Sequence, residues 1–141
     1  MTTSVSSIPI TAMPHLSDAN PALGRATVLT KAALRAAERL GVTDRQLAQI
    51  IGVSEATISR LWRNEAVLED GTKPFQMAVV FVRIFRSLDA ITGGDEGVAR
   101  AWLTKPAIGL SNCKPIDLLQ TTAGAEAVEE YLTRLEYGVY V

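Results

Sequence analysis

Four side chains between positions 56 and 63 have the types and the spacing to recognise the edges of nucleic-acid bases. They are Ala56, Ser59, Arg60 and Arg63. Because they recur at i, i+3, i+4 and i+7, they would form one stripe on a helix. The guanidinium of Arg60 can donate two hydrogen bonds to guanine, Ser59 can donate or accept, and Ala56 can contact the methyl group of thymine. Glu55 could accept from cytosine, although a carboxylate in a first helical turn is also favoured by the helix dipole alone.

The stripe lies in residues 44–63, whose apolar positions have the spacing of two short helices joined by a turn. Gly52 sits where the chain must turn sharply, and we expect it at positive φ. Thr43 and Gln46 have the spacing of a capping box for the first helix, and Ser54 is the expected N-cap of the second. The residues expected to share one small core are Leu47, Ala48, Ile51, Val53, Ile58 and Leu61.

Residues 44–63 resemble the Xre/Cro-type helix-turn-helix, and the alternative is a helical hairpin with no DNA-binding role. The resemblance implies that the second helix enters the DNA major groove and that Gln46 also contacts a phosphate. In the alternative, Arg60 and Arg63 are ordinary solvent-exposed residues. Trp62 is expected in the core. The candidate DNA-binding residues are Gln46, Ser54, Glu55, Ala56, Thr57, Ser59, Arg60 and Arg63.

The charge of the chain constrains how it could bind DNA. Its formal net charge is −1, whereas phosphate neutralisation by Lys and Arg supplies most non-specific affinity for DNA. Residues 44–63 hold three arginines against two carboxylates, a balance of +1, and residues 115–141 hold one arginine against five carboxylates, a balance of −4. We therefore expect weak binding by one copy, hence a homodimer or a larger assembly with a partner protein, and a C-terminal part that does not touch DNA.

Few residues are available for catalysis, metal binding or export. Cys113 and His15 are the only cysteine and the only histidine, so neither an internal disulfide nor a metal cluster is expected. The sequence has no Gly-rich phosphate loop and no set of acid, base and nucleophile, so we expect no enzyme activity and no cofactor. The longest apolar run, residues 78–82, is too short to span a bilayer. With no signal-peptide pattern either, we expect a cytoplasmic protein without membrane contact.

The pattern along the chain is helical throughout, which predicts an all-α fold. Helices are expected over residues 21–40, 74–92, 115–119 and 123–136, with a further helix capped by Asp95. The three predicted parts are a flexible arm or loosely packed extension (1–20), a helix-turn-helix domain (21–92) and a small helical domain (95–141).

The second half carries a set of residues that are common individually. Their order and spacing together form a pattern that is specific enough to compare with known families. The set comprises Trp102, Lys105, Pro106, Gly109, Pro115, Leu118, Leu119, Gly124, Val128, Leu132, Tyr137, Gly138 and Val139. It resembles the toxin-binding domain of Xre/MbcA/ParS-type antitoxins. The resemblance implies a type II antitoxin that binds a RES-domain toxin, similar in fold to ADP-ribosyltransferases and acting on NAD. It also implies repression of the antitoxin's own operon through operator DNA.

Within the second half, the C-terminal end is the expected inhibitory element. An acidic helix ending at a glycine is followed by apolar residues with polar tips, which suit an interface. In the alternative, the tail docks back on its own helices. The candidate toxin-binding residues are Glu129, Glu130, Arg134, Tyr137, Gly138, Val139, Tyr140 and Val141. A stand-alone repressor, whose second half dimerises or senses a ligand, is the alternative function; an enzyme is a third hypothesis.

Overall fold

The computed structural model describes residues 20–138, and within them it confirms the predicted all-α fold. The elements in chain order are α2 (Pro21–Leu40), α3 (Asp44–Ile51), α4 (Glu55–Trp62), α5 (Lys73–Thr92), α6 (Glu96–Thr104), the 3-10 turn η1 (Ile108–Leu110), α7 (Pro115–Leu118) and α8 (Thr122–Tyr137). One isolated bridge pairs Ala107 with Cys113. The predicted arm, except for Asn20, lies outside the described residues. Between residues 20 and 138, no helix has the length and apolar character needed to cross a membrane.

The helix ends follow the capping chemistry that the sequence predicted. Thr43 Oγ1 accepts from Gln46 N at 3.1 Å, while Gln46 Oε1 accepts from Thr43 N at 2.9 Å, so the capping box is complete. Ser54 caps α4 by accepting from Thr57 N at 3.1 Å. Gly52 closes α3 at φ 81°, in the left-handed region, which confirms the sharp turn. The last helix is one residue longer at each end than the predicted 123–136.

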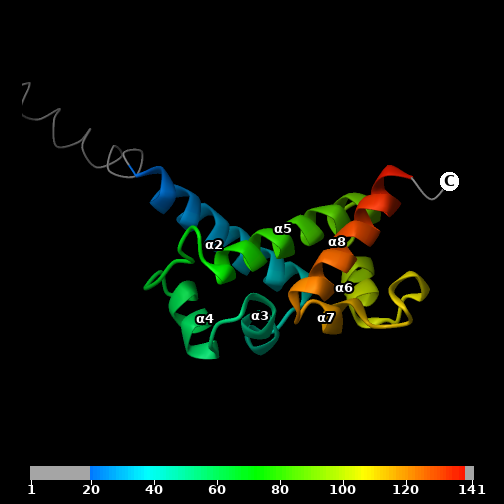
Figure 1. The fold of residues 1–141 in the computed structure, drawn as a ribbon, viewed down its shortest axis with the longest axis horizontal. Coiled ribbons are helices and arrows are strands. Elements are labelled where there is room, and N and C mark those ends of the chain that lie inside the picture. The colour runs from blue at the N-terminus through cyan, green and yellow to red at the C-terminus, as the bar shows by residue number, and fades with distance from the viewer. Residues whose placement is uncertain (1–19, 139–141) are drawn as a thin grey trace, which may run out of the picture.

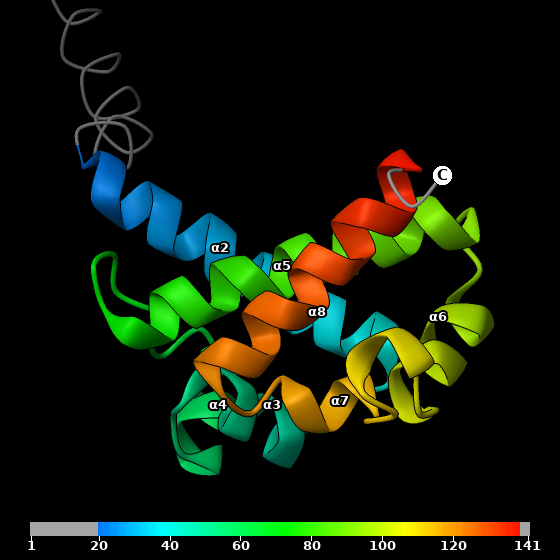
Figure 2. The ribbon, with the colours of Figure 1, turned by 45° about the vertical axis from the view of Figure 1, so that its right-hand side comes forward.

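The two long helices α2 and α5 cross and pack on one another, and α5 also packs on α8 (Figures 1 and 2). The short α3 packs on α5 and on α4, which places the helix-turn-helix at one end of α5. Within the described residues, one hydrophobic cluster runs from Ala33 to Leu132 and includes Phe81, Ile84 and Leu88 of α5. Because this core is continuous, α5 holds the two halves in a fixed relation. The domain boundary between residues 92 and 95 stays a prediction.

The loop from α4 to α5 is fixed by a buried hydroxyl. Thr30 on α2 is 3% exposed, and its Oγ1 accepts a hydrogen bond from Leu68 N at 2.9 Å while donating to Ala26 O at 2.6 Å. A buried hydroxyl that uses both functions is fully compensated for its lost hydration. The loop is thereby tied to α2.

The second half is attached to α2 through α6. Arg100 Nε donates to Arg39 O at 2.8 Å, which satisfies a carbonyl in the last turn of α2. Trp102 of α6 stacks on Tyr131 of α8, with ring centroids 6.3 Å apart and planes 13° apart. Gly109 lies so close to the Tyr131 ring that a Cβ at position 109 would overlap the ring edge. The glycine thus allows η1 to lie against this pair.

Candidate functional site

The outward face of α4 has the composition that the sequence analysis predicted. Ala56, Arg60 and Arg63 are exposed and Ser59 is half-buried. On the opposite face Ile58 is fully buried, so the helix has one orientation on α3 and the core. Four of the eight predicted DNA-binding residues therefore form one accessible face, and whether that face contacts DNA stays a prediction.

The two arginines of this face differ in what already holds them. Arg60 Nη2 donates to Thr57 Oγ1 at 3.1 Å, a neutral contact one turn back on α4. Arg63 forms two hydrogen bonds of 3.1 Å with the carboxylate of Glu65. Both members of that pair are more than half exposed, and such a pair contributes only about 0–1 kcal/mol. To contact a phosphate or a base, Arg63 must give up its ion pair with Glu65. Arg60 forms no ion pair within residues 20–138, so its guanidinium needs to break only the hydrogen bond to Thr57.

The remaining predicted DNA-binding residues lie at helix N-termini. Ser54 and Thr57 form a side-chain hydrogen bond of 3.0 Å beside the N-cap bond, so both hydroxyls are engaged locally. Gln46 uses its Oε1 in the capping box, which leaves its amide hydrogens for another acceptor. Glu55 is exposed in the first turn of α4, where the helix dipole stabilises it without any ligand. Positively polarised N-termini of two helices thus border the α4 face.

Trp62 is the residue at which the sequence prediction was wrong. It is 43% exposed rather than in the core. Its indole Nε1 donates to Asp44 Oδ1 at 3.2 Å, because the N–H needs an acceptor and the nearest carboxylate lies at the surface start of α3. Only the tertiary arrangement of α3 and α4 brings these residues together.

The predicted toxin-binding residues lie on and after α8, and the charged ones differ in exposure and in their ion-pair partners. Glu129 is 25% exposed and its carboxylate lies 3.8 Å from Arg83 on α5, so it is turned toward the body of the protein. Glu130 pairs with Arg134 at 3.2 Å, with both side chains more than half exposed. Tyr137 is 75% exposed, and Gly138 ends α8 at φ 68°. Val139, Tyr140 and Val141 lie outside the described residues.

Exposed apolar side chains near η1 were not predicted as part of any site. Ile108 is 91% exposed and Val98 is 52% exposed. Both adjoin the segment that carries Trp102, whose ring is half-buried against Tyr131. The sequence signal was only an apolar residue in a Pro- and Gly-framed loop, which does not distinguish an exposed side chain from a buried one. In residues 20–138 no three His, Cys, Asp or Glu side chains are grouped as metal ligands.

Comparison with known proteins assigns a description to each half of the chain. Residues 22–69 match the sequence model of the antitoxin Xre-like helix-turn-helix domain. Residues 87–138 match that of the antitoxin Xre/MbcA/ParS C-terminal toxin-binding domain. The two matches lie on either side of the first part of α5.

One curated relative and one solved structure agree with these matches. Antitoxin Xre of Yersinia enterocolitica is 40% identical over 60 residues, which span 43% of this chain and 40% of that protein. One chain of the crystal structure of the M. tuberculosis MbcT-MbcA toxin-antitoxin complex superposes with a TM-score of 0.63 at 23% identity. The superposition covers 81% of this chain and 98% of that chain. At this identity, the likeness to the solved structure establishes the fold.

Proposed function

The chain belongs to the Xre/MbcA/ParS-type antitoxins with a helix-turn-helix, and we propose that it neutralises a RES-type, NAD-consuming toxin by direct binding and represses its own operon. The relative and the solved structure are described as an antitoxin and as a toxin-antitoxin complex, which supports a toxin as the partner of this chain. We propose no catalytic role for the chain itself. We propose that it acts in the cytoplasm, where it would reach both its operon DNA and its partner protein.

One structural observation carries the combined proposal. The α4 face and the C-terminal end of α8 lie at opposite ends of the described structure in both views, joined by α5 (Figures 1 and 2). A toxin held at the end of α8 therefore leaves α4 accessible. Neutralisation and repression can then occur in one complex without competition for the same surface.

For DNA binding, we propose that two copies act together. The stripe of Ala56, Ser59, Arg60 and Arg63 reads base edges, while Gln46, Ser54, Glu55 and Thr57 border it. With a balance of +1 in residues 44–63, one copy neutralises too few phosphates for tight binding. A two-fold pair is expected to recognise a palindrome whose half-sites lie about one helical turn, roughly 34–36 Å, or a multiple apart.

For toxin binding, we propose that the end of α8 and the residues after it enter the toxin's NAD cleft. Tyr137 supplies exposed aromatic area beside the glycine at which the helix stops. Glu130 and Arg134 are exposed partners of one another and can exchange that pair for charges on the toxin. Glu129 contributes only if Arg83 releases it. The remaining proposed contacts are Gly138, Val139, Tyr140 and Val141.

A truncation ending at Glu136 tests the tail within the full system. The neighbouring open reading frame is expressed with either the full chain or the truncated chain, and growth, cellular NAD and operator-reporter activity are measured. We expect the truncated chain to repress the reporter while NAD falls and growth stops. Full protection by the truncated chain would move neutralisation to the body of α8 and η1.

The stand-alone repressor is separated from the antitoxin by co-purification. An antitoxin is expected to be recovered with the neighbouring gene product, which cannot be cloned without it. Recovery of the chain alone, with a harmless neighbour, would contradict toxin neutralisation and leave only repression.

A further inference from the structure

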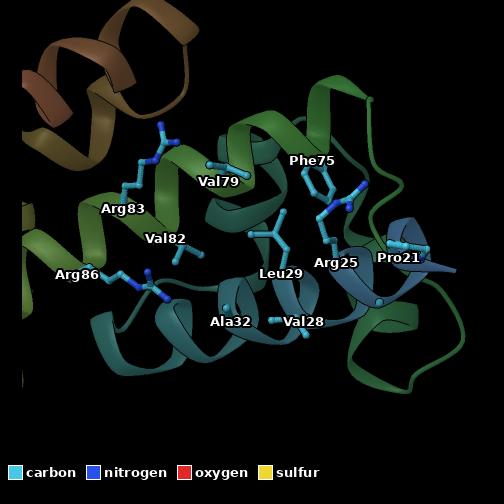
Figure 3. Close-up of a pocket in the computed structure, with 11 residues that line it drawn as sticks. Pro21, Arg25, Val28, Leu29, Ala32, Phe75, Val79, Val82, Arg83 and Arg86 are labelled. Carbon is cyan, nitrogen blue, oxygen red and sulfur yellow. The ribbon is translucent and has the colours of Figure 1, made fainter. Parts of the chain in front are cut away.

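An open apolar groove of about 730 Å³ runs between α2 and α5, on residues that neither proposed activity uses. In Figure 3, Val28, Leu29 and Ala32 of α2 face Val79 and Val82 of α5 across it. Val28 is 69% exposed, so it adds uncovered apolar surface to the groove. The volume is in the range of ligand-binding clefts, roughly 300–1,000 Å³, but the groove is open, which suits an elongated occupant that lies along it.

Arginines border the groove, but they do not make it a site for an anion. Arg25 is paired with Asp70 at 2.7 Å, and Arg83 lies 3.8 Å from Glu129. Their side chains are 61% and 64% exposed, and Arg86, the third arginine of the lining, is exposed as well, so water screens all three charges. The floor is formed by aliphatic and aromatic carbon, including Phe75 (Figure 3). The groove therefore favours an uncharged, apolar occupant over an acidic one.

The chain itself supplies such a segment next to the groove. Pro21, the first residue of α2, lies at one end of the groove beyond Arg25 (Figure 3). Nineteen residues precede Asn20, and Asp18 is the only carboxylate or basic side chain among them apart from the neutral His15. Residues 8–13 have the sequence Ile-Pro-Ile-Thr-Ala-Met, in which Thr11 carries the only polar side chain. The apolar side chains of Ile8, Ile10, Ala12 and Met13 are of types that proteins commonly bury.

We propose that residues 8–13 of the same chain bind along this groove, antiparallel to α2. The groove spans residues 21 to 32 of α2, about 16 Å at 1.5 Å per residue. Six extended residues span at most roughly 20 Å, so residues 8–13 are long enough to cover the groove. Residues 14–19 then form the connection that reverses the chain direction between Met13 and the start of α2. This connection contains Pro14, Ser17 and Asp18, which are residue types that favour turns. Pro9 restricts Ile8 to an extended backbone, which fits a strand-like ligand between two helices.

Docking of this segment extends the packing between α2 and α5. The segment covers Val28 and contacts α5 near Arg83, the residue that faces Glu129 of α8. The interaction does not depend on the toxin or on DNA, so it can be tested on the purified full chain alone.

The test uses the full chain with labelled Ile, Leu, Val and Met methyl groups in solution NMR. We expect nuclear Overhauser contacts from the Ile8 or Ile10 methyls to the methyls of Val28 and Val79. The double variant Ile8→Asp/Ile10→Asp should remove these contacts, shift the Val28 methyl signals and lower Tm by roughly 4 °C. The matched control Val5→Asp, in the same arm but outside residues 8–13, should leave the Val28 signals and Tm unchanged.

Each alternative occupant predicts a distinct result. Contacts that appear only between differently labelled copies, in a sample that light scattering shows to be dimeric, would overturn the proposal in favour of a second copy. The absence of any arm contact, with Val28 signals identical in the wild type and the double variant, would leave the groove to another ligand and also overturn it. Equal effects of Val5→Asp and the double variant would contradict the assignment to residues 8–13.

Discussion

The indole Nε1 of Trp62 donates a hydrogen bond to Oδ1 of Asp44 at 3.2 Å, which ties the last residue of α4 to the first residue of α3. The buried faces of the two helices belong to the same hydrophobic cluster, which includes Ala48 of α3 and Ile58 of α4. A hydrogen bond between the helix ends therefore helps to fix the angle at which α4 presents its outward face.

Replacing Trp62 by Phe removes this hydrogen bond and keeps most of the ring. We expect the free energy of unfolding to fall by about 0.5–1.5 kcal/mol, the usual net value of one hydrogen bond. Urea unfolding of Trp62→Phe, Asp44→Ala and the double variant measures the coupling between the two side chains. Strictly additive losses would mean that the bond contributes nothing in solution.

Replacing Arg60 by Ala tests the α4 face. Arg60 is exposed and holds no ion pair within residues 20–138, so we expect a loss of about 1–3 kcal/mol in operator binding and a relaxed base preference in each half-site. Gel-shift titrations on the upstream promoter measure both. Arg86→Ala, which removes the same charge from α5, is the control and should change affinity much less. Equal losses would reduce Arg60 to a general electrostatic contribution.

Replacing Gly52 by Val tests the turn between α3 and α4. Gly52 has φ 81°, yet a Cβ there meets no heavy atom within 4 Å. The cost should therefore be conformational, about 1–3 kcal/mol, without a packing term. Thermal melting should show a clear drop for Gly52→Val and a smaller one for Gly52→Asn, since Asn tolerates the left-handed region. A Val variant that melts with the wild type would contradict this account of the turn.

Replacing Gly124 by Ala tests the start of α8. A Cβ at this buried position would overlap the carbonyl group of Leu118, which is backbone and cannot rotate away. We expect a loss of roughly 1–3 kcal/mol in the free energy of unfolding, as in overpacked cores. Gly97→Ala in α6 is the control, because its Cβ approaches no atom closer than 3.4 Å and alanine favours the helix. If Gly124→Ala proved as stable as the control, α8 would have to start differently in solution.

The sequence by itself determined the features that depend on neighbours a few residues apart. The capping box of Thr43 and Gln46, the N-cap Ser54 and the left-handed Gly52 all rest on local hydrogen bonds and backbone preferences. The same periodicity identified α2, α5 and α8 and the outward stripe on α4, because one apolar face per helix is enough to show which side is buried.

Only the tertiary structure decided relations between residues far apart in the chain. Trp62 reaches Asp44 across 18 positions, and Thr30 accepts from Leu68 across 38. Glu129 is turned toward Arg83, which no pattern on α8 alone could indicate. The groove is lined by residues of both α2 and α5, more than 40 positions apart in the chain. Hydrophobic burial is non-directional, so the sequence specifies which faces are covered but not which partner covers each of them.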